Sequence, residues 1–191
     1  IKMFDEISKT YDLLNRIITL GIDSFWRRKI YEMIKKFKHE FVLDIATGTG
    51  DLIIELSKLD AKKIIGIDIS PKMLEIGVEK LNKMGLSKKI TMLLGDSEDL
   101  QFKDKSFDVV TVAFGVRNFE NLDKALNEIK RVLKPRGILI ILETAIPKNK
   151  IVRLTYKIYT KFIMPVVGFI FSKKFYAYNY LSKSAEVFPY G

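Results

Sequence analysis

The sequence contains no cysteine, and this absence excludes several kinds of chemistry. Without cysteine the chain can form no disulfide, no thiolate nucleophile and no thiolate-bound metal site. Histidine is almost as scarce, because His39 is the only one. It precedes the first predicted strand, so we expect a surface residue there rather than a catalytic base. We therefore expect no metal site.

Long uninterrupted apolar runs are also missing, although 48% of the residues are hydrophobic. The most apolar segment, 151–171, carries Arg153, Lys157 and Lys161, and the charge-free stretch covers only 162–172. A helix that crosses a bilayer needs about 20 apolar residues, so this segment is not expected to do so. The start of the chain shows no secretory leader, and we expect a cytoplasmic protein.

The positive charge lies mainly at the ends of the chain. The net charge is +10, yet 41–143 carries equal numbers of acidic and basic residues. Residues 144–191 carry eight Lys or Arg against Glu186 alone, together with half of the chain's aromatic residues. Such a flank can face nucleic acid, anionic lipid or an acidic substrate, or simply keep the protein soluble. Composition leaves these alternatives open.

The middle of the chain has the pattern of an α/β fold. Apolar runs predict strands, and helical patterns between them predict helices; the expected strands are 41–46, 63–69, 90–94, 109–113 and 138–142, and the expected helices are 52–58, 71–84 and 123–133. Strands that are almost wholly apolar are typical of a parallel sheet covered by helices on both faces. We expect a single domain of 191 residues, made of a helical N-terminal cap (1–40), a core (41–143) and a basic, aromatic helical segment (144–191).

Glycines follow the first predicted strand in the turn TGTGD, 47–51. Gly48 and Gly50 allow a positive φ and let a ligand approach the bare backbone. A dinucleotide fingerprint would place a third glycine at position 53, which is Ile53 here. The turn therefore indicates a ligand site but disfavours NAD and FAD.

Acidic residues follow the next two predicted strands. Asp68 could accept hydrogen bonds from both hydroxyls of a ribose, because a carboxylate offers two oxygens. Asp96 could accept one from an adenine amino group. The plainer alternatives are a helix N-cap for Asp68, although Ser70 is better placed before Pro71, and an ordinary loop carboxylate for Asp96. Because the carboxyl ends of parallel strands share one edge of the sheet, the three signals together predict a ligand site there.

These motifs lie in a sequence that resembles class I S-adenosylmethionine-dependent methyltransferases. The segments that carry the resemblance are VLDIATGTGD, GIDISPKML, GDSEDLQFKDKSFDVV and LKPRGILIILE. Three more are similar to the UbiE/MenG group, the C-methyltransferases of ubiquinone and menaquinone biosynthesis: FDEISKTYDLLNRIITLGIDSFWRRK, AFGVRNF and AYNYLSKSAEVFP. The resemblance covers almost the full chain and implies a Rossmann-like methyltransferase fold with helical additions at both ends.

The resemblance implies S-adenosyl-L-methionine as the cofactor and S-adenosylhomocysteine as its product. The positions that match the family's cofactor contacts are Thr47, Gly48, Thr49, Gly50, Asp68, Met73, Asp96, Ser97, Ala113 and Phe114. Three features depart from the family pattern. Some relatives carry serine in place of Ala113, and LKPRG replaces the usual LKPGG, so Arg136 needs either an ordinary φ or a rarer one. The chain also stops at Gly191, so we expect about five strands without the family's closing β-hairpin.

The resemblance further implies methyl transfer to a ring carbon of a polyprenyl quinol. Arg117 and Asn118 are then the catalytic candidates, because a cation near a quinol oxygen would favour the nucleophilic phenolate. Tyr11, Tyr178 and Tyr180 are weaker candidates for substrate binding, together with Arg117. The alternative for Arg117 is an ion pair with an acid such as Glu143 or Asp51. The DPPY or NPPY motif of amino-directed methyltransferases does not follow the fourth strand.

The basic C-terminal segment suggests two roles. It could rest on the inner membrane surface and admit the isoprenoid tail, or it could pack as a lid or as the contact surface of a homo-oligomer. No nucleic-acid partner is expected, although a methyltransferase acting on RNA or another small molecule stays an alternative, as does a non-catalytic cofactor-binding protein. The choice between benzoquinol and naphthoquinol, the tail length and the general base stay open.

Overall fold

The core of the protein is a parallel β-sheet of five strands, seen in a computed structural model that describes residues 2–19, 21–144, 149, 153–155 and 159. The strands are β1 (Phe41–Ile45), β2 (Lys63–Asp68), β3 (Ile90–Leu94), β4 (Phe107–Ala113) and β5 (Leu133–Leu142). They lie in the order β3-β2-β1-β4-β5, and all four neighbouring pairs are parallel. The predicted α/β fold with about five strands is confirmed.

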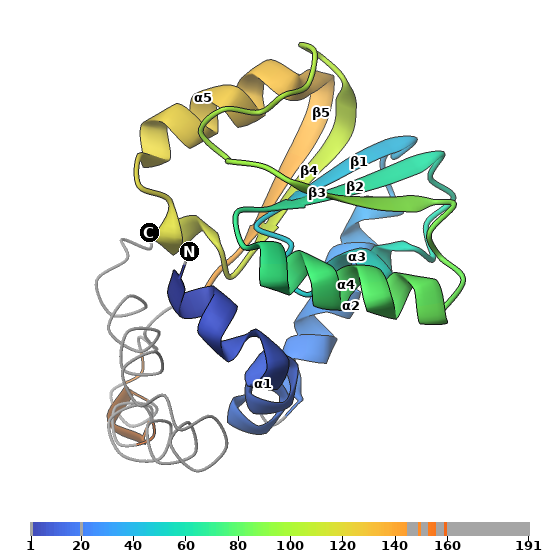
Figure 1. Cartoon of the computed structure of the whole chain (residues 1–191). Coiled ribbons are helices and arrows are strands. Elements are labelled where there is room, and N and C mark those ends of the chain that lie inside the picture. The colour runs from blue at the N-terminus through green and yellow to red at the C-terminus, as the bar shows by residue number, and fades with distance from the viewer. Residues whose placement is uncertain (1, 20, 145–148, 150–152, 156–158, 160–191) are drawn as a thin grey trace.

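Helices cover both faces of the sheet (Figure 1). One face carries α2 (Ile22–Ile34), α3 (Asp51–Leu56) and α4 (Pro71–Lys83), and the other carries α5 (Leu122–Val132). Helix α1 (Lys2–Ile18) packs beside α4.

Each face of the sheet has its own hydrophobic core, because strand side chains alternate in direction. On one face Val42 packs in a cluster with Ile53 of α3. On the other face Leu43 belongs to a cluster with Ile129 of α5. Since helices bury both faces, neighbouring residues of one strand are both buried, which explains the uninterrupted apolar runs.

The last two strands begin earlier than the sequence predicts. β4 starts at Phe107 rather than at position 109, and β5 starts at Leu133 rather than at position 138. Leu133 pairs with Phe107 and Ile138 with Val109, so residues 134–137 bulge out of the ladder. The predicted turn at Pro135 and Gly137 is therefore a bulge inside a longer strand. Proline is tolerated there because a bulge needs no ladder hydrogen bond from its nitrogen.

Arg136 lies in this bulge with a φ of +66°, so it adopts the rarer of the two expected conformations. We expect Arg136→Gly to raise the free energy of unfolding by about 0.5–1 kcal/mol. A non-glycine residue in the left-handed region costs about 1–2 kcal/mol, and the extra entropy of an unfolded glycine offsets part of the gain. Urea denaturation measures the change. Arg136→Ala is the control, because it keeps the Cβ and should give no gain; a glycine variant less stable than the alanine variant would contradict the prediction.

Little of the C-terminal segment belongs to the described residues. Beyond β5 these are 143–144, 149, 153–155 and 159, and 153–155 are helical. The expected helical segment 144–191 lies mostly outside the described residues. The candidates Tyr178 and Tyr180 lie wholly outside them. Within the described part of the chain, no helix is long and apolar enough to cross a membrane.

Candidate functional site

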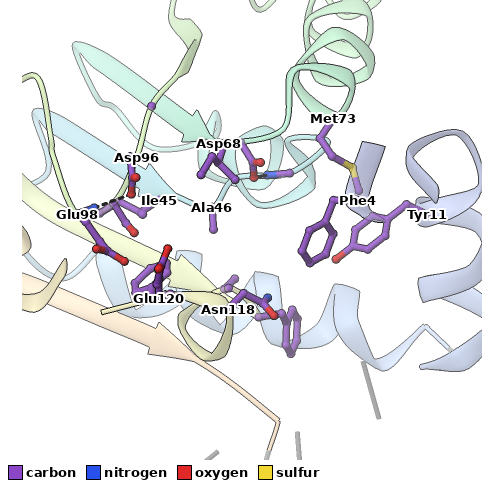
Figure 2. A pocket seen from close by; sticks show the side chains of 18 residues that line it. Phe4, Tyr11, Ile45, Ala46, Asp68, Met73, Asp96, Glu98, Asn118 and Glu120 are labelled. Atoms are coloured by element: carbon purple, nitrogen blue, oxygen red, sulfur yellow. Dashed lines mark hydrogen bonds between the residues drawn. The ribbon is translucent and has the colours of Figure 1, made fainter. Parts of the chain in front are cut away.

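A cavity of about 310 Å³ opens at the carboxyl ends of β1, β2, β3 and β4. Phe4 and Tyr11 of α1 lie at one end of it with Met73 of α4, and Asp96 and Glu98 lie at the other end (Figure 2). Seven of the ten predicted cofactor-binding residues line this cavity: Gly48, Asp68, Met73, Asp96, Ser97, Ala113 and Phe114. Its walls combine flat apolar side chains with carboxylates.

Asp68 joins the turn after β1 to the end of β2. Its Oδ2 accepts a hydrogen bond from the Gly48 N–H at 2.8 Å, and its Oδ1 accepts one from the Ser70 N–H at 2.8 Å. Burial raises the pKa of Asp68, although these two donors act in the opposite direction. Ser70 itself caps α4, because its Oγ accepts from the Met73 N–H. The prediction that Ser70 caps α4 is therefore confirmed. Asp68 does not cap this helix and lines the cavity.

The strand ends approach each other closely beneath the cavity. Ala46 directly follows β1 and Phe114 directly follows β4, and both have positive φ values, of 55° and 57°. A Cβ added at Gly115 would lie 2.5 Å from the Cβ of Ala46, so only glycine fits there without displacing the turn. The glycine of AFGVRN thus allows the ends of β1 and β4 to meet.

Helix α1 is fastened across the glycine turn by its acidic residues. The Thr49 hydroxyl donates to Asp12 Oδ1 at 2.5 Å, and Lys80 Nζ lies 2.5 Å from Asp12 Oδ2 and 2.6 Å from Asp51 Oδ1. The Ser70 hydroxyl donates to Asp5 Oδ1 at 2.6 Å. Sequence reasoning missed Asp5 and Asp12, because nothing in a helical pattern indicates which loop its polar face will meet.

The three other predicted cofactor-binding residues lie beside the main cavity rather than in its wall. Thr47 and Thr49 line a smaller cavity next to it. Gly50 precedes α3 with a φ of 81° and lines neither of the two. The hydroxyl of Thr49 is already bound to Asp12.

Asp44 is a buried acid that sequence reasoning also missed. It lies in β1 and is 1% exposed, and Thr111 of β4 donates a hydroxyl hydrogen bond to its Oδ1 at 2.6 Å. Burial raises the pKa of Asp44 to about 7. A signal was present, because Asp44 is the single charged residue in the otherwise apolar run FVLDI.

Arg117 forms an ion pair with Glu143, which is the alternative that the sequence left open. Arg117 lies in the short 3-10 helix η1 (Val116–Asn118), and its Nη1 donates to Glu143 Oε1 and, at 3.4 Å, to the Thr144 hydroxyl. The two side chains are only 9% and 8% exposed. Arg117 Nε and Glu143 Oε2 are buried and have no hydrogen-bond partner among the described residues. Arg117 does not line the main cavity, whereas Asn118 does.

Tyr11 links α1 to the region of Arg117. Burial raises the pKa of the Tyr11 hydroxyl, while its hydrogen bond with Asn15 and the positive charge of Arg117 lower it. The electrostatic influence of Arg117 therefore reaches Tyr11, which lines both cavities. Three of the predicted catalytic and substrate-binding residues, Tyr11, Arg117 and Asn118, thus lie in one region at the end of β4.

Solved structures with the same fold come from several methyltransferases. A protein from Methanococcus maripaludis, described as a candidate S-adenosyl-L-methionine-dependent methyltransferase, superimposes with a TM-score of 0.68 over 84% of this chain and 73% of its own, at 24% identity. A SAM-dependent methyltransferase from Aquifex aeolicus gives a TM-score of 0.56 over 62% of this chain and 65% of its own, at 30% identity. The Rossmann-like methyltransferase fold expected from the sequence is confirmed.

Curated relatives match along nearly the whole chain. The demethylmenaquinone methyltransferase of Bacteroides fragilis is 45% identical over 191 residues, which are 100% of this chain and 78% of that protein. The enzyme of the same name from Thermotoga maritima is 45% identical, over 96% of this chain and 79% of its own. The ubiquinone/menaquinone biosynthesis C-methyltransferase UbiE of Geotalea daltonii is 41% identical, over 98% and 80%. The model of the ubiE/COQ5 methyltransferase family matches residues 1–191. The chain therefore belongs to the ubiE/COQ5 methyltransferase family.

Proposed function

We propose that this protein transfers a methyl group from S-adenosyl-L-methionine to a ring carbon of demethylmenaquinol. The products are menaquinol, S-adenosylhomocysteine and the proton that the ring carbon loses. The observation that carries the proposal is the cavity at the strand ends, with Asp68 and Asp96 at successive strands, in a chain of a methyltransferase family. The naphthoquinol is preferred because relatives at 45% identity are named demethylmenaquinone methyltransferases.

The cavity has the chemistry that the adenosine part of this donor needs. Ile45, which lies beside Asp96 in Figure 2, and Phe119 provide apolar surface for a flat base. Each oxygen of Asp68 accepts one backbone N–H, so each keeps a lone pair for a ribose hydroxyl. Asp96, at the far end, would accept a hydrogen bond from the adenine amino group. The volume of about 310 Å³ falls at the lower end of ordinary ligand pockets.

The residues at the end of β4 would handle the quinol. When bound, the donor supplies an electrophilic methyl group on its sulfonium, and the protein must align a nucleophilic carbon with it. The ring carbon becomes nucleophilic as a neighbouring phenol loses its proton, and the positive charge of Arg117 favours the resulting phenolate. Asn118 lines the cavity and would hydrogen-bond the same quinol oxygen. Tyr11 of α1 would contact the acceptor from the opposite side.

The isoprenoid tail requires a route to the membrane. The eight basic residues and the aromatic residues of 144–191 suit a surface that rests on anionic lipid. Peripheral membrane contact through this segment remains a prediction, as do a cytoplasmic location and a homo-oligomer.

Incubation with methyl-labelled donor tests the proposal directly. Demethylmenaquinol, the demethylated ubiquinol precursor and bulk tRNA are offered in parallel, and the products are weighed by mass spectrometry. We expect demethylmenaquinol to gain one methyl group. Methylation of the benzoquinol alone would change the proposed acceptor, and methylation of tRNA alone would favour an RNA methyltransferase. Tight donor binding with no transfer to any acceptor would favour a non-catalytic protein.

A further inference from the structure

Helix α2 is apolar on two sides. Its inner side, with Ile30 and Ile34, is buried in the core. Its outward side exposes five large apolar side chains, each between 46% and 55% accessible to solvent: Ile22, Phe25, Trp26, Met33 and, just after the helix, Phe37. At 3.6 residues per turn these five positions share one side, as do Lys29 and Lys36. We call the seven residues the α2 surface. A helix at the surface of a globular protein usually has a polar outward side, so this one is exceptional.

Two aromatic rings stand together at the centre of the α2 surface. The rings of Phe25 and Trp26 pack edge to face with their centroids 5.4 Å apart, and Lys29 Nζ lies 5.4 Å from the centroid of Phe25. Tryptophan has an apolar body and one polar N–H, and it is enriched where a membrane meets water. Aromatic rings beside a lysine therefore have the chemistry of a group that enters the headgroup layer of a bilayer.

The charge around the α2 surface is positive. Residues 22–38 contain six basic residues and two acidic ones. Both acids are paired, because Asp23 is buried with Arg27 Nη2 at 2.6 Å and Glu32 Oε2 lies 2.7 Å from Lys35 Nζ. The exposed basic residues that remain include Lys29 and Lys36. An apolar helix side edged by lysine is typical of helices that lie on anionic lipid.

We propose that the α2 surface docks on an anionic lipid bilayer. Phe25, Trp26 and Met33 enter the headgroup layer, and Lys29 and Lys36 meet the lipid phosphates. The inference rests on the proposed function, because the quinol proposed there has an isoprenoid tail that a bilayer holds. It assigns membrane contact to a described helix, whereas the contact predicted for 144–191 comes from composition alone.

Charge favours lipid over the two other occupants of such a surface. In a symmetric contact with a second copy, the same patch meets itself, so Lys29 and Lys36 would face the same lysines of the other copy. The chain's own segment 144–191 carries eight basic residues against Glu186 alone, so it too would bring like charge. Like charges placed together at an interface are unfavourable, whereas lipid phosphates supply the opposite charge.

The position of α2 brings the docked bilayer near the site. Arg27 of α2 lines the smaller cavity, which shares Tyr11 and Phe114 with the main cavity. A helix with its side chains is about 10–12 Å across. A bilayer on the outward side of α2 would therefore lie about one helix diameter from the cavity wall, on the side where the quinol is proposed to bind.

Fluorescence of Trp26 tests the inference on the full chain, because Trp26 is the only tryptophan and is 46% exposed. The protein is titrated, without donor or quinol, with phosphatidylcholine vesicles that contain about 30% phosphatidylglycerol or none. With the anionic vesicles we expect the emission to shift to shorter wavelength. Lipids brominated on their acyl chains should quench it, and acrylamide in the water should quench it less than before. Added salt should weaken the binding.

Two double variants separate the apolar and the charged contributions, and cosedimentation with the anionic vesicles measures both. Phe25→Ser with Met33→Ser should lower the partition coefficient by at least about tenfold. Lys29→Gln with Lys36→Gln should lower it by about 10- to 30-fold, since each lysine near an anionic surface contributes roughly fivefold.

Each variant has a matched control at exposed positions outside α2. Val78→Ser with Met84→Ser removes two exposed apolar side chains in and directly after α4. Lys58→Gln with Lys83→Gln removes two exposed charges. Both controls should bind the vesicles like the wild type.

Several outcomes would overturn the inference. Vesicle binding that both α2 variants keep would assign the contact to another segment, and no vesicle binding by the wild type would exclude it. If Trp26 is already shielded from acrylamide without lipid, ultracentrifugation identifies what covers it. A dimer would indicate a second copy, and a monomer would indicate the chain's own segment.

Methyl transfer to demethylmenaquinol with a short tail, dissolved without lipid, keeps this inference separate from the proposed function. We expect the α2 variants to retain this transfer and to lose transfer to long-tailed quinol held in vesicles, in step with their loss of binding. If the short-tailed quinol is methylated but the α2 surface binds no lipid, only the inference fails. If the protein binds vesicles through α2 but methylates no quinol, the proposed function fails.

Discussion

Removing the charge of Arg117 together with that of Glu143 is expected to lower kcat by about 100-fold or more. In the proposed mechanism the positive charge of Arg117 favours the phenolate as it forms, and loss of one such group at a reacting oxygen commonly costs about 10²–10³ in rate. The variant that tests this carries both Arg117→Gln and Glu143→Gln. It neutralises both members of the buried pair and keeps groups that can hydrogen-bond in their place. Donor affinity should stay near the wild-type value, because neither residue lines the main cavity.

A single substitution such as Arg117→Leu gives a less clear result. It would leave Glu143, 8% exposed, as an unpaired buried charge, which costs about 3–5 kcal/mol. Lost activity could then reflect lost folding. The double variant avoids this, since neutral replacement of a buried ion pair is often close to neutral for stability.

The pair formed by Asp108 and Lys134 offers a matched control for the charge of Arg117. Lys134 Nζ lies 3.0 Å from Asp108 Oδ1, and Asp108 is 5% exposed, but neither lines the main cavity. Asp108→Asn with Lys134→Gln should leave kcat unchanged. Single-turnover kinetics with demethylmenaquinol measures both double variants. Full turnover by the variant of Arg117 and Glu143 would show that the pair only holds η1 in place.

Asp68→Asn is expected to weaken S-adenosylhomocysteine binding by about 10- to 100-fold. In the proposed complex the carboxylate of Asp68 accepts two ribose hydroxyls in addition to the N–H groups of Gly48 and Ser70. An amide keeps only one acceptor oxygen, so at least one of these hydrogen bonds to a charged group is lost. Isothermal titration calorimetry measures the affinity, and thermal denaturation checks that the turn after β1 remains folded.

The pH dependence of donor affinity offers an independent check on Asp68. Burial raises the pKa of this carboxylate in the free protein, and the ribose hydroxyls would bind its ionised form. Affinity should therefore be full above that raised pKa and fall as the pH drops through it, at a higher pH than for an ordinary aspartate. The asparagine variant should lose this part of the dependence. Asp60→Asn, at the opposite end of β2 and exposed, should keep both the affinity and the profile of the wild type. Wild-type affinity in Asp68→Asn would exclude the ribose contact.

Local patterns in the sequence determined most of the fold. The apolar runs at β1, β2, β3 and β4 predicted parallel strands, because strands buried on both faces are made mostly of apolar residues. Ser70 before Pro71 predicted the start of α4, because a capping hydroxyl and a proline at the first helical position act within one turn. Motifs along the chain also indicated the family, which the match over residues 1–191 confirmed.

The extent of the last strands needed the tertiary structure. Pro135 and Gly137 look like a turn when read locally, yet β5 starts at Leu133 because its neighbour β4 supplies ladder partners on both sides of a bulge. The conformation of Arg136 follows from that bulge and not from its own preference. A strand boundary set by a partner about 26 residues away has no signal in the adjacent sequence.

The electrostatics of the site were likewise decided only by the tertiary structure. Arg117 was predicted to be catalytic from the motif in which it lies. In the structure it pairs with Glu143, which is 26 residues further along the chain and follows the adjacent strand β5. The contact between Asp12 and Thr49 spans 37 residues, and the bond between Thr111 and Asp44 spans 67. Such contacts depend on which strands are neighbours and on where α1 packs beside α4 at the strand ends. The sequence by itself thus determined which elements form and at which edge of the sheet polar residues gather. Burial and charge pairing arose only when distant segments packed together, and they set the protonation of each residue and the groups that it can contact.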